Sequence, residues 1–123
     1  MNKFIPVCEP YLPGNEKKYV LDTISTNWIS SAGNYIEEFE KKFSKFCGVN
    51  YGVCCTNCYA ALHLACLAIG LKKGDEVIVP TFTMLAPLSA IIQTGAKPVL
   101  VDANSETYCI DVNKIEPLIN KKT

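Results

Sequence analysis

Hydrophobic side chains in the first part of the chain recur with the spacing of an amphipathic helix. The segment from 15 to about 26 begins at Asn15, which is placed to cap a helix, and it has one apolar side. The residues expected to face inward on that side are Tyr19, Val20 and Ile24. An irregular lead-in at 9–14 precedes this predicted helix, and a loop at 28–33 without a clear period follows it.

A second amphipathic helix is predicted between Asn34, as its cap, and Gly48, which takes the usual position just past a helix end. Its apolar residues follow 3-4-3 spacing, and we expect its aromatic side chains to belong to a core. These apolar residues are Ile36, Phe39, Phe43 and Phe46, whereas the charged residues 37, 38, 41 and 42 fall on the solvated face.

From residue 51 the pattern changes to short apolar runs that alternate with helical stretches. Strands are predicted at 51–55, 76–80 and 98–102, and helices at 57–70 and 83–94. The strand residues are apolar without alternation, which indicates that both faces of the sheet are covered. Strand–helix–strand order with short connections predicts parallel pairing through right-handed crossovers. The expected fold class is therefore α/β, a mostly parallel sheet with helices on both faces, preceded by two N-terminal helices.

The last predicted helix starts at Asp111 and carries Ile115, Leu118 and Ile119. Pro117 lies inside it, where a proline costs about 3 kcal/mol or forces a kink. About three parallel strands form only part of a doubly wound sheet and leave unpaired edges. We therefore expect residues 1–123 to be part of a larger fold or to need a partner, with 1–50 as a helical segment and 51–123 as a partial α/β sheet.

Composition narrows the classes of function. Twelve basic and 12 acidic side chains balance, so no long-range field attracts nucleic acid or an anionic membrane. The longest near-apolar stretch, 84–92, is far shorter than a bilayer span. The N-terminal residues 1–6 lack the apolar core and the cleavage site of a signal peptide. These features predict a globular, cytoplasmic protein that binds neither nucleic acid nor membrane.

The cysteine count is high and odd, seven in all, and four of the seven crowd between 54 and 66. We interpret the compartment as reducing and most of the thiols as small buried apolar groups. Two alternatives use Cys55 and Cys58, with Cys47, His63 and Cys66 nearby, as a zinc site or a redox dithiol. The apolar helix around His63 favours a packed, hydrogen-bonded histidine instead, and we expect no metal site.

Ligands of open parallel sheets bind beyond the carboxyl ends of the strands. Three segments meet that description, at 56–59, 81–84 and 102–104. In the first, a strand ends and a helix begins within one or two residues, with Thr56 and Asn57 at the junction. The N–H groups of that first turn, with the positive end of the helix dipole, form an anion site that suits a phosphate. The alternative is that Thr56 or Asn57 only caps the helix. Asp102 similarly either orients a ligand or caps a loop.

A set of short motifs runs along nearly the whole chain in one order and spacing. They read Ile-Pro-Val at 5–7 with Glu-Pro at 9–10, Asn-Trp-Ile-Ser-Ser-Ala-Gly at 27–33, Glu-Phe-Glu at 38–40, Ala-Ala-Leu-His-Leu-Ala at 60–65, Lys-Gly-Asp-Glu-Val-Ile-Val-Pro-Thr-Phe-Thr at 73–83, Thr-Gly-Ala-Lys-Pro-Val at 94–99 and Val-Asp at 101–102. With these motifs the chain resembles the N-terminal part of nucleotide-sugar aminotransferases of the DegT–StrS type.

That resemblance implies the large domain of a fold type I aminotransferase and a requirement for pyridoxal 5′-phosphate. Members of this family transfer an amino group from glutamate to a 3-keto or 4-keto sugar on a nucleotide carrier, for polysaccharide, lipopolysaccharide or antibiotic-sugar biosynthesis. They work as dimers whose active sites are shared between subunits. The resemblance therefore implies a nucleotide-sugar substrate, a glutamate donor and a homo- or heterodimer.

The residues that the resemblance assigns to the cofactor depart from the family's pattern. The phosphate would lie at Asn57, Cys58 and Tyr59. At the positions that correspond to 56–59 of this chain, members of the family usually have the sequence Ser/Thr-Asn/Ser-Gly-Thr. Cys58 replaces the glycine, and it adds strain of about 1–2 kcal/mol if that position needs a positive φ. Tyr59 replaces a short hydroxyl side chain with a bulky ring. Met84 stands where members place an aromatic residue against the pyridine ring.

The resemblance also assigns Trp28, Ser30 and Ser31 to the entrance for the nucleotide sugar. The family's Schiff-base lysine, and the aspartate that pairs with the pyridine nitrogen, would lie beyond residue 123, so no catalytic residue is assigned. Because an aminotransferase needs that lysine amine, we expect a truncated or split member that is inactive alone. The alternative is a non-catalytic relic or binding subunit that pairs with a full-length aminotransferase.

Overall fold

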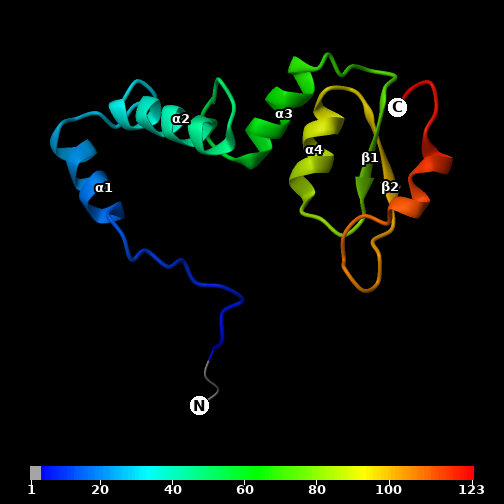
Figure 1. Cartoon of the computed structure of the whole chain (residues 1–123), viewed down its shortest axis with the longest axis horizontal. Coiled ribbons are helices and arrows are strands. Elements are labelled where there is room, and N and C mark those ends of the chain that lie inside the picture. The colour runs from blue at the N-terminus through cyan, green and yellow to red at the C-terminus, as the bar shows by residue number, and fades with distance from the viewer. Residues whose placement is uncertain (1–3) are drawn as a thin grey trace. The chain divides into compact units, whose positions relative to one another are not determined.

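The computed structural model describes residues 4–123 (Figure 1). Of residues 1–6, which lack the pattern of a signal peptide, the first three lie outside the described part. The described residues form two compact units, one that ends at Val53 and one that spans Cys54–Thr123. Two helices belong to the first unit, and a short parallel sheet with helices belongs to the second. The predicted α/β class, preceded by two N-terminal helices, is confirmed.

Helix α1 spans Glu16–Ser25 and is preceded by Asn15 at the N-cap position, as predicted. The Asn15 side chain makes no capping hydrogen bond. The helix ends at Thr26, and Asn27 then adopts a left-handed conformation with φ of 61°. Asparagine tolerates that conformation better than most residues, so Asn27 turns the chain out of the helix at little cost.

Helix α2 spans Asn34–Cys47. The prediction that Asn34 caps it is wrong, because Asn34 is its first helical residue and the extended Gly33 takes the cap position. Its C-terminal end is confirmed, since Gly48 adopts a left-handed φ of 70° and closes the last turn. Ion pairs between Glu37 and Lys41, 2.6 Å apart, and between Glu38 and Lys42 follow the solvated side of the helix.

The aromatic stripe of α2 does not form the predicted core. Phe39, Phe43 and Phe46 stack on one another along the helix, but all three side chains are exposed. The chain that leaves α2 returns over the opposite side, where Gly52 lies against the Glu40 carbonyl and Ser44, the buried residue of the helix. No second layer therefore covers the aromatic side within the described part of this unit.

The side of α1 that was predicted to face inward is also exposed, because no second layer covers it within the described part of this unit. Tyr19, Val20 and Ile24 all keep roughly half of their surface in solvent. On α1, Tyr19 packs against the Tyr35 ring of α2, and Asp22 accepts a hydrogen bond from the Tyr35 hydroxyl. One aromatic contact and one hydrogen bond are too few to bury an amphipathic face.

The second unit has the predicted alternation of helix and strand. Helix α3 spans Cys58–Ala68, strand β1 Glu76–Pro80, helix α4 Leu85–Gln93 and strand β2 Lys97–Val101. The two strands are parallel, with Glu76 opposite Lys97 and Pro80 opposite Val101. Segment 51–55, predicted as a strand, is irregular, and β1 and β2 pair only with each other in the described sheet.

The core of this unit lies between α4 and the sheet. Val79 from β1, Ile91 from α4 and Ala96 from the turn before β2 are buried together. Partly buried apolar residues surround them, namely Cys66, Leu71, Val77 and Leu88. Coverage is incomplete on β2, where Leu100 keeps 53% of its surface exposed, although the unbroken apolar pattern predicted full cover. Leu100 instead lines an open cavity of about 340 Å³ with Pro117 and Leu118.

The predicted helix from Asp111 is two short 3₁₀ turns, η1 at Val112–Lys114 and η2 at Glu116–Leu118. Pro117 explains the break, because its nitrogen donates no hydrogen bond and a continuous helix through it would be strained. In the first turn of η2 that missing donor costs nothing. Asp111, the predicted start of the helix, caps η1 instead, since its Oδ1 accepts from Asn113 N at 3.1 Å. In Figure 1 these turns and α4 lie on opposite sides of the two strands.

The cysteines are less enclosed than predicted. Cys8, Cys47, Cys58 and Cys109 are exposed, and the other three, Cys54, Cys55 and Cys66, are half-buried. All seven lie in the described residues, and none of them forms a disulfide. The small core explains the error, because a two-stranded sheet with one helix packed on it encloses few positions.

The two neighbouring isoleucines of α4 test this core. Ile91 is 4% exposed and Ile92 is 57% exposed. We expect Ile91→Ala to lower the free energy of unfolding by about 2–4 kcal/mol, because it leaves a cavity against Val79. Ile92→Ala, the matched control, should cost well under half as much. Urea unfolding followed by circular dichroism measures both, and equal losses would contradict the described core.

Candidate functional site

The carboxyl ends of β1 and β2 meet at one edge of the sheet because the strands are parallel. Residues 81–84 follow β1 there, and Asp102 follows β2. The first turn of α3 lies at the same end of the unit. His63 of α3 lies beside Ala90 of α4, and each of these residues is five positions after the first residue of its helix. The two helices therefore begin at the same level. At the far ends, Gly95 after α4 lies against Lys73 after α3.

Asn57 begins α3 and performs the predicted capping role. Its backbone is extended, and its side-chain Oδ1 accepts a hydrogen bond from Ala60 N at 2.9 Å. Cys58 and Tyr59 follow as the first two helical residues, so no carbonyl of their own helix accepts their N–H groups. The cap and the anion site are therefore compatible, because the side chain occupies one donor of the first turn and leaves two others open.

These donors suit the phosphate of a pyridoxal cofactor. Backbone N–H groups at a helix N-terminus, with the positive end of the dipole, are the usual partners of a phosphate. Cys58 has a helical conformation, and it is not among the described residues with positive φ, so the strain considered for this position does not arise. The Tyr59 ring lies along α3 beside the His63 ring, with centroids 6.3 Å apart and planes 13° from parallel.

His63 has the structural role that its apolar helix predicted. Its Nδ1 lies 3.2 Å from the carbonyl oxygen of Ala90, one of the last four carbonyls of α4. Those carbonyls have no partner further along the helix, so an Nδ1–H donor satisfies one of them. This hydrogen bond joins α3 to α4, and the prediction of a packed, hydrogen-bonded histidine is confirmed.

Met84 is the N-cap residue of α4 and is 79% exposed. It ends the segment 81–84, which is neither helix nor strand. Phe82 of the same segment contacts Tyr108, with ring centroids 5.5 Å apart and planes at 44°. Sequence reasoning missed Tyr108, because no local pattern indicates a contact between residues so far apart in the chain.

The end of β2 carries a small charged cluster. Asp102 Oδ2 pairs with Lys114 Nζ at 3.2 Å, and Asp111 Oδ2 lies 3.8 Å from the same amine. Asp102 also accepts a backbone bond from Asp111 N through its carbonyl oxygen. Asp102 thus fastens the loop that follows β2, in line with the loop-capping alternative, and Lys114 is the cation that it holds.

The loop assigned to the nucleotide sugar belongs to the first unit. Trp28 follows the left-handed Asn27 and lines a cavity of about 420 Å³ with Asp22, Thr26 and Tyr35 among others. Ser31 lines a different hollow, of about 310 Å³, beside Gly33 and Ile36. The hydroxyl of Ser30 accepts from Ala32 N at 3.3 Å and shapes the turn itself. The three predicted residues therefore share one loop without sharing one cavity.

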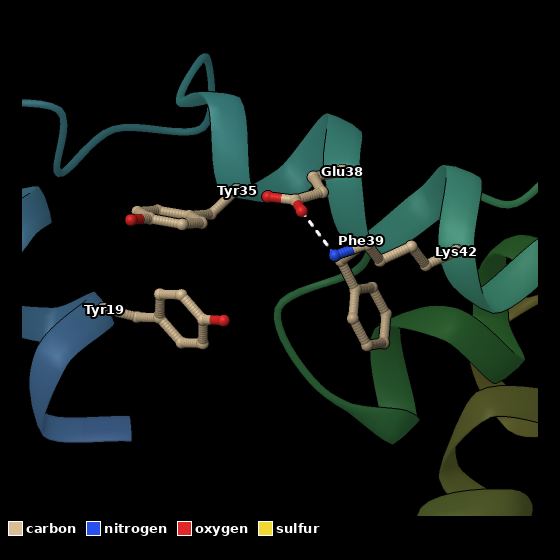
Figure 2. Close-up of a pocket in the computed structure, with 5 residues that line it drawn as sticks. All are labelled: Tyr19, Tyr35, Glu38, Phe39 and Lys42. Atoms are coloured by element: carbon tan, nitrogen blue, oxygen red, sulfur yellow. Dashed lines mark hydrogen bonds and ion pairs between the residues drawn. The ribbon is translucent and has the colours of Figure 1, made fainter. Parts of the chain in front are cut away.

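A further cavity of about 270 Å³ lies between α1 and α2, and sequence reasoning did not identify it. Figure 2 shows the Tyr19 and Tyr35 rings at one side of it, in contact and tilted by 59°, with the ion pair of Glu38 and Lys42 alongside. The Tyr35 hydroxyl donates to Asp22 Oδ2 at 2.8 Å. That hydrogen bond, and the nearby carboxylate charge, raise the pKa of Tyr35 above its usual value.

Two kinds of site receive no support from the geometry. Across residues 4–123, no three histidine, cysteine or acidic side chains lie close enough together to hold a metal ion. Within the same residues, no helix has the length and the apolar character needed to cross a membrane.

The sequence matches the model of the DegT/DnrJ/EryC1/StrS aminotransferase family over residues 10–123. The chain belongs to that family. Its relatives include GDP-perosamine synthases of Escherichia coli O157:H7, 50% identical over 98% of this chain, and of Caulobacter vibrioides, 48% identical over 97%. The chain covers 33% and 32% of these proteins, so it spans about a third of the length of the curated relatives that it matches.

Solved structures include proteins with the same local fold. A putative sugar aminotransferase of Streptococcus pneumoniae in its PMP form matches 97% of this chain with a TM-score of 0.87 and 35% identity. A Bacillus subtilis protein with bound cofactor PMP matches 99% with a TM-score of 0.80 and 33% identity. The chain covers 30% of each of these structures. The fold is therefore a partial fold type I aminotransferase domain.

The capping hydrogen bond of Asn57 gives a direct test of how α3 begins. We expect Asn57→Ala to lower the free energy of unfolding by about 1 kcal/mol, because Ala60 N loses its acceptor. Asn57→Ser, which keeps an acceptor oxygen, should recover most of that loss.

Asn15→Ala is the matched control, since Asn15 takes the N-cap position of α1 without a side-chain bond. Thermal unfolding followed by circular dichroism compares the three variants. A larger loss at Asn15 than at Asn57 would show that the cap is misassigned.

Proposed function

We propose that this chain provides the phosphate-binding turn and the nucleotide-sugar loop of a pyridoxal-phosphate-dependent aminotransferase. The substrate in this proposal is a keto sugar linked to a nucleotide, and the amino donor is glutamate. The product would serve amino-sugar and polysaccharide biosynthesis. Membership of the aminotransferase family supports the reaction class, and the GDP-perosamine synthases among the relatives support the substrate class.

The observation that carries the proposal is the first turn of α3. Asn57 holds the turn in shape through Ala60 N, and the N–H groups of Cys58 and Tyr59 point out of the helix end. In the proposal these two N–H groups donate to the cofactor's phosphate, and Met84 packs its thioether against the pyridine ring. When bound, the cofactor supplies the electron sink that makes amino transfer feasible.

The nucleotide sugar is assigned to the loop at 28–33. Trp28 offers an indole ring for stacking and an N–H donor, and Ser30 and Ser31 offer hydroxyl groups. Trp28 is 54% exposed beside a cavity, which leaves its ring available for such a contact. Members of the family act as dimers, and we assign a second copy or a longer relative as the partner.

In this proposal the 123 residues bind the cofactor but do not transfer an amino group by themselves. Covalent attachment of the cofactor requires a lysine amine placed beside its aldehyde carbon. At the carboxyl edge of the sheet, Lys114 is held by Asp102 and Asp111. Lys73 precedes β1 and lies against Gly95, which places it at the opposite edge.

One observation favours a second function, that of a binding subunit for a full-length aminotransferase. The stacked stripe of Phe39, Phe43 and Phe46 is exposed, and apolar patches of this kind commonly mark protein interfaces. Co-expression with a full-length relative and size-exclusion chromatography test this function. Joint elution that Phe43→Asp abolishes would support it, and separate elution would remove it.

Binding of pyridoxine 5′-phosphate tests the proposed phosphate turn. This analogue lacks the aldehyde, so it forms no chance adducts with surface lysines. We expect Cys58→Pro to weaken its binding about ten- to a hundredfold, because one N–H donor to a charged group is lost. Proline is tolerated at the first helical position after an extended residue, so α3 itself should persist.

Cys58→Ala keeps the N–H group and serves as the matched control, with affinity expected to match that of the unmodified chain. Isothermal titration calorimetry measures all three proteins, and pyridoxine without phosphate should bind none of them. Equal binding by Cys58→Pro and Cys58→Ala would refute the assignment of this turn to the phosphate.

Borohydride reduction after incubation with pyridoxal 5′-phosphate tests the proposed lack of a matching amine. We expect no stoichiometric adduct at any single lysine by mass spectrometry, because Lys114 at the carboxyl edge is held by Asp102 and Asp111, and Lys73 lies at the opposite edge. A stoichiometric adduct at one lysine would contradict that part of the proposal.

A further inference from the structure

The segment between β1 and α4 is held by few contacts. Thr81 N donates to Val101 O at 2.8 Å, and residues 82–84 then cross to α4 without regular secondary structure. Met84 takes the N-cap position without a side-chain capping bond. Phe82 is 67% exposed, so burial does not fix its position. The side-chain contact that the structure gives this segment is the one between the Phe82 and Tyr108 rings.

The loop after β2, in contrast, is tightly cross-linked. Ala103 and Ile110 form an antiparallel bridge, and Asn104 and Cys109 are joined by a backbone hydrogen bond. Inside this bridge, Asn104 Oδ1 accepts from the backbone N–H groups of Glu106 and Thr107 at 2.9 and 3.0 Å. The Lys114 ion pair with Asp102 fastens the base of the loop. The loop is thus a rigid support at the same edge of the sheet.

Tyr108 is the residue that this loop presents to Phe82, and its backbone is strained. Its φ is 58°, and it shares a positive φ only with Asn27 among the non-glycine residues of the described part. An aromatic residue is costly in this conformation, where glycine or asparagine would be relaxed. Strained positions of this kind tend to occur where a functional site fixes the geometry. The strain has a visible result here, which is the contact of the Tyr108 and Phe82 rings.

We propose that Tyr108 is a positioning residue that holds Phe82, and through it Met84, in place to pack against the pyridine ring of the cofactor. This inference rests on the function proposed above, because that function gives Met84 its role. Tyr108 itself does not touch the cofactor in this arrangement. Its ring acts through Phe82, two positions before Met84, and the cross-linked loop supplies the rigidity.

Two variants at position 108 separate the ring from the backbone. Tyr108→Asn removes the ring and relaxes the left-handed backbone, so the loop should fold at least as readily as before. Tyr108→Phe keeps the ring contact and removes only the hydroxyl. Phe82→Ala removes the other half of the contact and should reproduce the effect of Tyr108→Asn.

Amide hydrogen exchange without any ligand tests the contact directly. We expect several-fold faster exchange of the Thr81 amide, which is bonded to Val101 O next to Phe82, in Tyr108→Asn and in Phe82→Ala, and unchanged exchange in Tyr108→Phe. Unchanged exchange in Tyr108→Asn would overturn the inference, whatever the cofactor does.

Calorimetry with two probes tests the consequence for the cofactor. Tyr108→Asn should weaken binding of pyridoxine 5′-phosphate several-fold and leave binding of inorganic phosphate at the α3 turn unchanged. Tyr108→Phe, which keeps the ring contact, should bind pyridoxine 5′-phosphate as tightly as the unmodified chain. Equal weakening of both probes would show a general structural effect and would overturn the positioning role, as would no weakening of either. If the unmodified chain binds neither probe, the proposed function fails, whereas the exchange measurement still decides whether Tyr108 holds the segment.

Discussion

The parallel pairing of β1 with β2 is the constraint on which the rest of the second unit depends. The register that sets Glu76 opposite Lys97 and Pro80 opposite Val101 brings the segments after both strands to one edge. It also places α4 against the sheet, where Ile91 meets Val79. Through the hydrogen bond from His63 to Ala90, the same arrangement aligns the first turn of α3 with that edge. Without this pairing, the first turn of α3, Met84 and Tyr108 would have no fixed relation to one another.

Local signals made much of this fold predictable from the sequence. Asn57 and the glycines at 48 and 70 mark helix ends because they provide a side-chain acceptor or a positive φ, both of which are local properties. The two strands were predicted to within one residue because short β-branched runs between turns have few other solutions. The errors concern what covers each element. Residues 51–55 have the composition of a strand but no partner, and the Phe39 stripe has the spacing of a core face but no covering layer.

The candidate site divides in the same way. The capped first turn of α3 could be predicted because Asn57 and the first residues of the apolar helix follow one another directly. Tyr108 could not, since its role comes from a contact with Phe82 and from a backbone conformation that no composition rule indicates. The cavity beside Tyr19 and Tyr35 was missed for a similar reason, because it forms only where α1 and α2 meet. Family membership explains why the ordered motifs extend along nearly the whole chain.

Gly95 has a consequence for how this part of the protein can vary. With φ of 87°, and with a hypothetical Cβ only 3.2 Å from the Lys73 side chain and 3.4 Å from its backbone, the position admits no other residue without displacing its neighbour. The two turns that lead into the strands are thereby sterically locked together at the amino edge of the sheet. Substitutions at the opposite, carboxyl edge leave this contact undisturbed. A cysteine and a tyrosine at the start of α3, and a methionine at 84, are changes that such a scaffold can absorb, because the strands beneath them are aligned from the other end.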